Sequence, residues 1–234
     1  MKSTLVIDIG GTGIKMIVAD EQGSPLTERD RELTPQPATP RAVMTTLQPM
    51  LARQPRFDRV SVGFPGVVRR GVVETAPNLG TAAWAGFDLG EALRSATDKP
   101  VKVMNDADLQ GYGVIAGVGV EMVITLGTGL GTALFTDGQL VCNLEFGHHP
   151  WDSDQTYEDY VGKAARKAIG KKPWRKRVTE IITRLQFVFS LDHLWVGGGN
   201  AKALKPGDLR EGVTLFSNVE GMAGGVRLWE LGGD

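Results

Sequence analysis

Two stretches of the chain share one pattern of apolar and glycine positions. Residues 5–20 read LVIDIGGTGIKMIVAD, and residues 122–137 read MVITLGTGLGTALFTD. In each, an apolar run predicts a buried strand, the glycines predict a turn, and a second apolar run predicts the returning strand. Aligned without a gap, Asp20 falls on Asp137, an offset of half the 234-residue chain. We favour an internal duplication over two hairpins that are alike only because hairpins share one design.

The rest of the first half alternates strands with helices. The pattern predicts strands at about 25–32, 59–64 and 101–104, and a short hairpin through 65–74. Helices are predicted at about 40–53 and 89–97 and from residue 106. Thr39, Asp88 and Asn105 stand where the N-caps of these helices belong, and Pro40 suits a first helical position.

The second half continues the alternation. Helices are predicted at about 157–169, 173–190 and 220–230, and a strand over residues 194–196. Strands alternating with helices predict a mostly parallel sheet that is covered on both faces. We therefore expect an α/β protein of two domains, residues 1–115 and 116–234, with any hinge near the glycines of residues 113–121.

Composition narrows the class of protein. Lys and Arg number 26 and Asp and Glu 27, and this net charge of -1 argues against a wholly basic nucleic-acid-binding protein. No apolar run is long enough for a membrane helix. Cys142 is the one cysteine, which argues against a disulfide and a cysteine-rich zinc site. We expect a cytoplasmic enzyme or binding protein with no nucleic-acid or membrane partner, and a homodimer as the commonest assembly.

A carboxylate stands at the end of the first predicted strand, directly before a glycine loop. The group comprises Asp8, Gly10, Gly11, Thr12 and Lys15. Glycines let backbone N–H groups approach an anion, and Asp8 suits a magnesium ion held through water. The segment is neither a Walker A loop nor a Rossmann fingerprint, because a strand follows it. We favour an anion site over a tight turn with an incidental aspartate, because a buried aspartate is costly.

Two further glycine clusters also follow predicted strands. Thr128 and Gly129 lie in the second copy of the loop, and Gly197–Gly199 follow the strand at residues 194–196. Ligands of α/β proteins bind at the carboxyl ends of strands. Two loops in symmetric positions are therefore expected to hold one phosphate chain.

Two further groups of polar residues have two interpretations each. Asn105 and Asp106 either place a proton acceptor at the end of a strand or cap a helix, and their spacing favours neither. Glu145 and His148, with Glu158 beyond them, either hydrogen-bond the hydroxyls of a sugar or lie in a solvated turn. A zinc site is not expected there, because no cysteine cluster accompanies the histidine.

Seven segments in chain order resemble the ROK family of sugar kinases, within the actin-like ATPase and hexokinase superfamily. They are DIGGTGIK at 8–15, PQPATP at 35–40, FPGVV at 64–68, NDAD at 105–108, LGTGLGTALF at 126–135, EFGH at 145–148 and VGGG at 196–199. Within the family they are most similar to the bacterial polyphosphate glucokinases. The resemblance implies a duplicated actin-like ATPase/hexokinase-type (ribonuclease H-like) fold, with two lobes around a cleft.

The resemblance also implies roles for individual residues. Asp106 matches the general base that deprotonates the 6-hydroxyl of the sugar, and Asp8 would assist Mg²⁺. The implied glucose ligands are Gly66, Asn78, Asn105, Asp106, Glu145, His148 and Glu158. The implied donor-phosphate ligands are Gly10, Gly11, Thr12, Lys15, Thr128, Gly129, Gly198 and Gly199.

Two departures from the family pattern refine this expectation. Most ROK proteins carry a cysteine-rich zinc motif after the EFGH-like segment, and its absence here implies no zinc and favours the polyphosphate glucokinases. The stretch between His148 and Glu158 is shorter than in those enzymes. The expected activity is a glucokinase that uses polyphosphate, with ATP as a further donor. The alternatives are an ATP-dependent ROK hexokinase for glucose or another hexose, and an inactive sugar-binding regulator.

A run of basic residues bears on the phosphoryl donor. Between Lys163 and Arg177 lie eight Lys and Arg residues and no acidic residue. A solvated helix face and a nucleic-acid patch are alternative interpretations. A linear polyanion needs such a track, because each of its phosphates carries charge. We expect Lys171, Lys172, Arg175 and Lys176 to guide polyphosphate.

Overall fold

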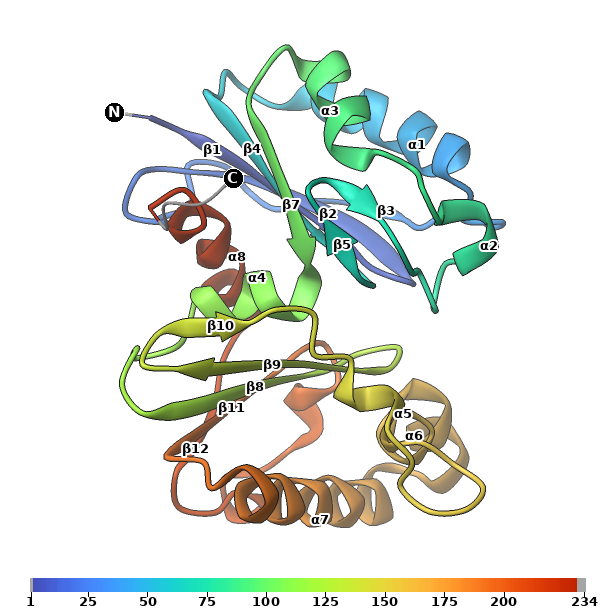
Figure 1. Cartoon of the computed structure of the whole chain (residues 1–234), viewed down its shortest axis with the longest axis vertical. Coiled ribbons are helices and arrows are strands. Elements are labelled where there is room, and N and C mark those ends of the chain that lie inside the picture. Colours follow the sequence, from blue (N-terminus) through green and yellow to red (C-terminus); the bar gives the residue numbers. More distant parts are fainter. Residues whose placement is uncertain (1, 231–234) are drawn as a thin grey trace. The chain divides into compact units, whose positions relative to one another are not determined.

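The computed structural model describes residues 2–230, which form two compact units (Figure 1). The first unit contains the chain up to Gly113 and again from Met222, and the second spans Val114–Gly221. The chain first passes from one unit to the other after Gly113, close to the predicted boundary after residue 115. The chain from Met222 belongs to the first unit, whereas the expected second domain comprised residues 116–234.

The sheet of the first unit has five strands in the order β3-β2-β1-β4-β7. Their bounds are β1 (Thr4–Ile9), β2 (Gly13–Ala19), β3 (Asp30–Leu33), β4 (Arg59–Phe64) and β7 (Val101–Asn105). β1, β2 and β3 form an antiparallel meander, while β4 and β7 run parallel to β1. A separate small hairpin pairs β5 (Val68–Arg69) with β6 (Val72–Val73).

The sheet of the second unit repeats this topology, in the order β10-β9-β8-β11-β12. Its strands are β8 (Val120–Leu126), β9 (Leu130–Thr136), β10 (Gln139–Val141), β11 (His193–Gly197) and β12 (Val213–Leu215). Strand directions match those of the first sheet pair by pair, as a duplicated fold requires. The expectation of a mostly parallel sheet is wrong for both units. Each sheet has two antiparallel strand pairs, from its meander, and two parallel pairs.

The two central hairpins differ by one residue in their turns. Ile9 pairs with Ile14 across the first turn, whereas Leu126 pairs with Leu130 across the second. The turn after β8 is therefore one residue shorter. The gapless alignment of the two copies consequently holds for the outgoing strands and is shifted by one position along the returning strands.

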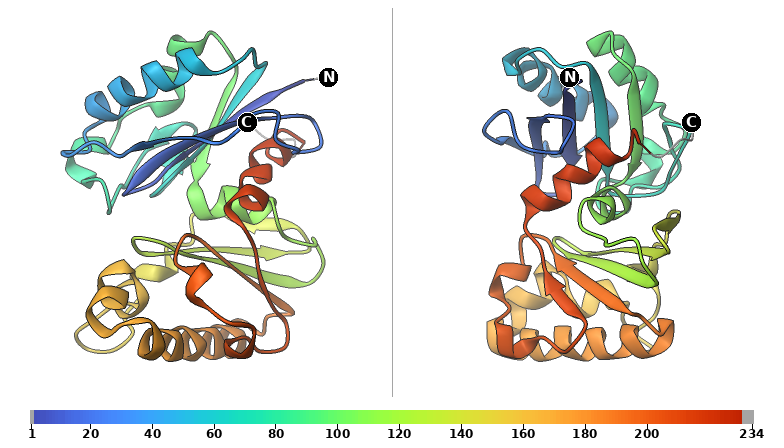
Figure 2. Two further views of the ribbon diagram at one scale, coloured as in Figure 1. Left: turned by 180° about the vertical axis from the view of Figure 1, so that it is seen from behind. Right: turned by 90° about the vertical axis from the view of Figure 1, so that its left-hand side faces the viewer.

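Helices cover both faces of the first sheet (Figures 1 and 2). The helices of this unit are α1 (Pro40–Arg53), α2 (Thr81–Trp84), α3 (Leu89–Thr97), α4 (Asp106–Tyr112) and the part of α8 (Asn218–Arg227) that follows Met222. Alternate residues of β1 enter separate cores: Leu5 and Ile7 pack in the core that α1 and α3 share, whereas Val6 packs with Leu109 of α4 and Met222 of α8. The predicted N-caps are confirmed by side-chain hydrogen bonds, as at Thr39, which accepts from the N–H of Ala42.

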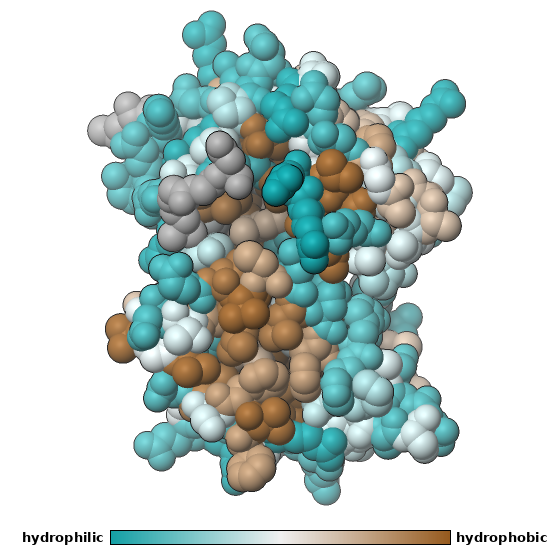
Figure 3. Space-filling model, in the orientation of Figure 1, coloured by the Kyte–Doolittle hydropathy of each residue, from teal (hydrophilic) through white to brown (hydrophobic). Residues whose placement is uncertain are grey.

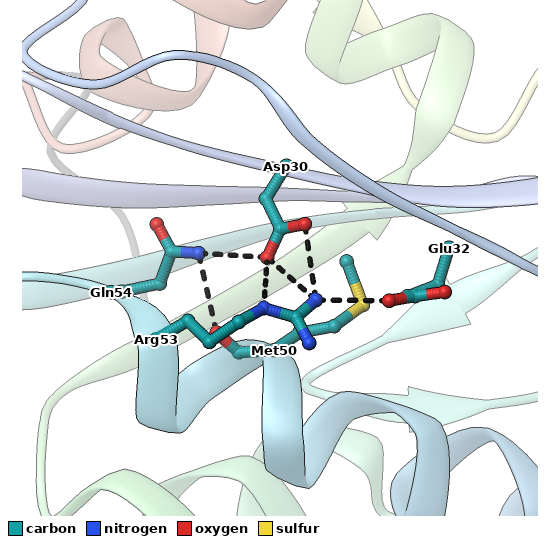
Figure 4. A network of polar contacts seen from close by, with 5 residues as sticks. All are labelled: Asp30, Glu32, Met50, Arg53 and Gln54. Atoms are coloured by element: carbon teal, nitrogen blue, oxygen red, sulfur yellow. Dashed lines mark hydrogen bonds and ion pairs between the residues drawn. The ribbon is translucent and has the colours of Figure 1, made fainter.

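The edge strand β3 is fastened to the end of α1 by a polar network (Figure 4). Arg53 donates three hydrogen bonds to Asp30, at 3.0 and 3.2 Å to one carboxylate oxygen and at 3.1 Å to the other, and a fourth bond reaches Glu32 at 3.0 Å. Gln54 also donates to Asp30, at 3.2 Å. The two carboxylates raise the pKa of Arg53, chiefly through the hydrogen bond with Asp30. Charged side chains of this kind also protect an edge strand against unwanted pairing.

The second sheet packs its core against α7 (Lys171–Phe189). Met122 and Ile124 of β8 meet a stripe on α7 that includes Trp174, Val178 and Ile181. The expected helix of residues 157–169 is two helices, α5 (Tyr157–Val161) and α6 (Lys163–Ile169). The break falls at Gly162, where a Cβ would lie 2.7 Å from the carbonyl oxygen of Glu158.

The remaining short elements of the second unit are 3₁₀ turns, η1 (Phe146–His148), η2 (Ala201–Ala203) and η3 (Pro206–Asp208). Among residues 2–230, no helix has both the length and the apolar character needed to span a membrane.

The return of the chain to the first unit depends on a close helix contact. A Cβ at Gly224 of α8 would lie 1.8 Å from the carbonyl oxygen of Leu109 in α4. Nearby, Ser61 donates to the carbonyl of Gly225 at 2.5 Å, and Trp229 donates to Ser61 at 2.7 Å. The pattern of apolar and polar residues does not predict these contacts, because each joins segments far apart in the chain.

Gly224→Ala tests this contact. The added methyl group meets backbone, which no rotamer change can relieve, so α8 must move away from α4. We expect the free energy of unfolding to fall by about 2 kcal/mol, even though alanine favours the helix. Chemical denaturation measures this change. Gly207→Ala is the control, because no atom outside the neighbouring residues lies within 4 Å of its Cβ position. Equal stability of both variants would contradict the packing described.

Candidate functional site

The first glycine loop begins with a buried ion pair. Asp8 of β1 and Lys15 of β2 are partners in the strand register, and Lys15 Nζ lies 2.5 Å from Asp8 Oδ2. The register therefore brings together two of the predicted site residues, with the ammonium group directed at the carboxylate. Asp8 is buried, as expected, and Lys15 supplies the countercharge that its burial requires.

The loop after Asp8 is closed by backbone and side-chain hydrogen bonds. The N–H of Gly10 donates to the carbonyl of Gly13 at 3.1 Å. Thr34, which follows β3, donates its hydroxyl to the carbonyl of Gly10 at 2.5 Å and its N–H to that of Thr12 at 3.4 Å. Gly11 is partly exposed and Thr12 is exposed, so a ligand can reach the turn. The sequence pattern missed Thr34, because its contact comes from another strand.

The second and third glycine clusters lie against each other within the second unit. Gly198 has a φ of +88°, and a Cβ there would lie 2.5 Å from the carbonyl oxygen of Leu126. Asn200 donates its N–H to that same carbonyl at 2.9 Å and its side-chain amide to the carbonyl of Gly127 at 2.7 Å. Thr128 and Gly199 are exposed at this surface. The structure therefore joins the two predicted donor segments of this unit.

Glu158 of α5 closes the other side of the second loop. Its carboxylate accepts a hydrogen bond from the N–H of Leu130 at 3.2 Å. A Cβ at Gly129 would overlap the same carboxylate, which explains the glycine at that position. Glu158 thus contacts the second glycine loop as well as lying near the EFGH segment.

Asn105 joins α4 to the turn at Gly66. Its side-chain oxygen accepts from the N–H groups of Ala107 and Asp108, at 2.8 and 3.1 Å, and its amide donates to the carbonyl of Gly66 at 3.3 Å. The helix-cap interpretation of Asn105 is therefore correct. Asp106 is the first residue of α4 and is half-buried. The turn needs glycine at 66, since a Cβ would lie 2.0 Å from the carbonyl oxygen of Thr75.

Asn78 lies in the exposed turn that precedes α2. The N–H of Leu79 closes this turn on the carbonyl of Ala76 at 3.0 Å. Asn78 and Gly66 both follow β4, as do the hairpin strands β5 and β6 that separate them.

The EFGH segment brings an acid and an imidazole together. Glu145 Oε2 lies 3.4 Å from His148 Nε2, on the 3₁₀ turn η1. Burial raises the pKa of Glu145, the charge of His148 lowers it, and the nearby charge of Glu158 raises it again. The three predicted sugar ligands of this unit are thus within electrostatic reach of one another.

The short stretch between His148 and Glu158 forms a hairpin that aromatic stacking holds on α7. A bridge pairs Pro150 with Thr156. Trp151 stacks on Tyr160 with ring centroids 4.4 Å apart, and the guanidinium of Arg184 lies 3.5 Å from the Trp151 centroid. These contacts hold the short stretch on α7.

The basic run divides into paired and exposed side chains. Arg175 lies 3.6 Å from Asp208, Arg166 stacks on Trp174, and Arg177 stacks on Tyr160. Lys171, Lys172 and Lys176, in contrast, are exposed on α7. The run starts at the second loop, because the N–H of Lys163 donates to the carbonyl of Thr128 at 3.0 Å. Arg175 is therefore paired within the protein, whereas the three lysines are exposed.

No group of three or more His, Cys, Asp or Glu suited to a metal ion occurs among residues 2–230. Asp8 is a single carboxylate beside an open glycine loop. One carboxylate fits a magnesium ion whose other ligands are water and substrate phosphates. It does not fit a metal held by protein ligands alone.

Comparison with known proteins identifies relatives. The family model described as ROK family matches residues 4–164. A polyphosphate glucokinase from Mycobacterium tuberculosis (strain CDC 1551 / Oshkosh) is 33% identical over 202 residues, covering 82% of this chain and 76% of that protein.

Solved structures agree with this likeness. Inorganic polyphosphate/ATP-glucomannokinase from Arthrobacter sp. strain KM matches with a TM-score of 0.86 and 33% identity over 99% of both chains. A ROK family glucokinase from Streptomyces griseus, in complex with glucose and AMPPNP, matches with a TM-score of 0.78 over 97% of this chain and 98% of that one. Its identity of 21% supports the fold alone. The predicted actin-like ATPase/hexokinase fold class is confirmed.

The electrostatic arrangement around Glu145 is testable by NMR titration of its side-chain carboxyl. We expect a pKa above that of an ordinary glutamate, because burial disfavours the charged form. Glu158→Gln should lower this pKa, since it removes a nearby negative charge, and His148→Gln should raise it further. Since the folded pKa is the higher one, ionisation of Glu145 weakens stability as the pH rises through it. A pKa at or below the ordinary value would contradict this geometry.

Proposed function

Because this chain belongs to the ROK family, we propose that it is a glucokinase that transfers a phosphoryl group from polyphosphate, and also from ATP, to the 6-hydroxyl of glucose. The observation that carries the proposal is the 33% identity, over 99% of the chain, to a polyphosphate/ATP-glucomannokinase. The relative from Mycobacterium tuberculosis, named a polyphosphate glucokinase, supports the same donor. An ATP-dependent hexokinase is the second candidate, supported by the glucokinase that holds glucose and AMPPNP.

Asp106 is the general base of the proposed reaction. It accepts the proton of the 6-hydroxyl as that oxygen attacks the terminal phosphorus of the donor, and the bond to the leaving phosphate breaks. Its position at the start of α4 is fixed by the cap and by Gly63, whose Cβ position lies only 3.2 Å from Asp106 Cα. Half-burial leaves its carboxylate accessible to a hydroxyl.

The proposed ligands of the sugar are the polar groups that the family resemblance names. Glu145, His148 and Glu158 accept from or donate to its hydroxyls in the second unit. In the first unit, Asn78, Asn105 and the turn at Gly66 do so. Hydrogen-bonding groups that a bound sugar covers reject analogues that lack a hydroxyl, because a polar group is then left unpaired.

The donor phosphates are bound by the glycine loops. The first loop contributes Gly10, Gly11, Thr12 and Lys15, and the second unit contributes Thr128, Gly129, Gly198 and Gly199. A magnesium ion held by Asp8 through water would neutralise phosphate charge. The loops position the donor for in-line attack, and positioning with charge neutralisation supplies most of the catalysis.

The exposed lysines of α7 guide polyphosphate in this proposal. Their support is the basic run that starts at the carbonyl of Thr128 and continues along α6 and α7. Arg175, which was expected to take part, is paired with Asp208 and so contributes less. ATP is too short to need the whole track.

Asp106→Asn tests the base. We expect turnover to fall by about 10²–10⁴-fold, with glucose still bound, because general-base contributions have that size. A coupled assay of glucose 6-phosphate measures turnover, and tryptophan fluorescence measures glucose binding. Glu28→Gln, which removes an exposed carboxylate from the same unit, should leave turnover unchanged. Near-normal turnover in Asp106→Asn would show that residue 106 merely begins a helix.

Replacing Lys171, Lys172 and Lys176 by Gln tests the donor track. We expect the Michaelis constant for polyphosphate to rise and its salt dependence to weaken, since fewer counterions are released on binding. The constant for ATP should change much less. A variant with Gln at Arg41, Arg56 and Lys99, exposed cations of the first unit, is the charge-matched control. Equal losses with polyphosphate and ATP would favour the ATP-dependent hexokinase.

A homodimer and a cytoplasmic location complete the proposal. Apolar side chains gather over the second sheet and toward α7 (Figure 3). Phe187 and Val188, near the end of α7, are 85% and 57% exposed. Exposed apolar side chains of this size support an interface with a second copy.

Phe187→Glu tests the dimer by light scattering. We expect the unaltered protein to have twice the mass of one chain and the variant to have the mass of one chain, because a charge is costly in an apolar interface. Gln22→Glu, at an exposed position of the first unit, should keep the larger mass. The same mass for Phe187→Glu and the unaltered protein would remove Phe187 from the interface.

A further inference from the structure

The carbonyl groups of the second glycine loop are all bound by donors of the protein itself. The carbonyls of Leu126 and Gly127 accept from the main chain and side chain of Asn200, at 2.9 and 2.7 Å. The carbonyl of Thr128 accepts from the N–H of Lys163, and that of Gly129 from the N–H of Gly127, each at 3.0 Å. Three successive carbonyl oxygens are therefore held by groups outside the loop, and the fourth by an N–H of the loop itself.

The first loop uses Thr34 in the same way. Its hydroxyl binds the carbonyl of Gly10 at 2.5 Å, and its N–H binds the carbonyl of Thr12 at 3.4 Å. Like Asn200, Thr34 is buried and follows a strand of the same sheet, β3 in one unit and β11 in the other. One buried polar residue in each unit thus gives a side-chain and a main-chain donor to two carbonyls of its loop.

This arrangement matters for an anionic ligand. A glycine-rich turn is free to rotate its peptide groups, because glycine tolerates many backbone conformations. A rotation that turned a carbonyl outward would place a partial negative charge beside a phosphate, whereas inward carbonyls leave the concave side to N–H groups. A hydrogen bond to the carbonyl opposes that rotation.

We propose that Thr34 and Asn200 are positioning residues of the phosphoryl-transfer reaction, which hold the carbonyls of the two glycine loops away from the donor phosphates. Neither residue touches the donor; each acts through its loop. The inference rests on the proposed function, because it assumes that the loops bind the phosphoryl donor. The two residues differ in type and stem from different strands, so the repeated pattern of the sequence does not reveal them.

Substitutions at both residues separate the hydrogen bond from the shape of the side chain. Thr34→Val keeps the shape and removes the hydroxyl, whereas Thr34→Ser keeps the hydroxyl. Asn200→Asp keeps the shape, cannot donate when ionised, and adds negative charge beside the loop. Thr97→Val is the matched control, because the Thr97 hydroxyl also donates to a main-chain carbonyl, that of Leu93 in α3, at 2.7 Å.

The measurements are calorimetric binding of short-chain polyphosphate without glucose, glucose binding by tryptophan fluorescence, and steady-state kinetics. We expect Thr34→Val to weaken polyphosphate binding by about threefold to tenfold, the range of one hydrogen bond. Asn200→Asp should weaken it by about tenfold or more, because repulsion adds to the lost bond. Thr34→Ser should restore most of the affinity, and glucose affinity should not change in any variant.

The outcomes distinguish this inference from the proposed function. An unaltered protein that neither binds polyphosphate nor phosphorylates glucose overturns the proposed function, and this inference with it. If the unaltered protein does both, while Thr34→Val and Asn200→Asp keep its donor affinity, only this inference is overturned. If Thr34→Val does not fold, the decision rests on Asn200→Asp. A loss of glucose affinity equal to that of donor affinity would also overturn it, because it would indicate a general structural role.

Discussion

The structure depends on how a buried hairpin turns at the centre of each sheet. β1 and β8 are the middle strands, and each reverses into its neighbour through three or four residues. Neighbouring groups leave no room for a side chain at two glycines around the second turn, Gly129 beside Glu158 and Gly198 beside Leu126. The same lack of side chains exposes the main chain to a ligand. Close packing and the proposed phosphate binding therefore both depend on these glycines.

Local signals in the sequence predicted the elements well, because caps and turns act over a few residues. Thr39 with Pro40 began α1 at the predicted position, and Asp88 and Asn105 capped their helices as expected. Contacts between distant segments were not predictable. The hydrogen bond from Asn200 to Gly127 joins residues far apart in the chain, and the pattern of each segment alone carries no trace of it. The gapless alignment hid the shorter second turn, although residues 11–13 and 127–129 both read GTG once the alignment is shifted by one residue.

At the candidate site, the charged residues were predictable from the sequence, whereas their partners were not. The sequence predicted a basic run and grouped its arginines with its lysines, because both carry a charge. In the folded chain the planar guanidinium of Arg177 stacks on an aromatic ring and that of Arg175 faces a carboxylate, while lysines stay in solvent. Glu145 and His148 were expected to act together, and their carboxylate and imidazole do meet. The raised pKa of Glu145 was not predictable from the sequence, because burial in the folded chain causes it.

The central claim is that this chain phosphorylates glucose with polyphosphate as donor. The most direct measurement is the initial rate of glucose 6-phosphate formation by the purified protein, with polyphosphate and with ATP in parallel and magnesium present. Polyphosphate must first be freed of nucleotide, so that a trace of ATP does not carry the reaction. The account predicts product with polyphosphate alone, at a rate that falls steeply as salt is added. Product with ATP and none with polyphosphate would contradict it.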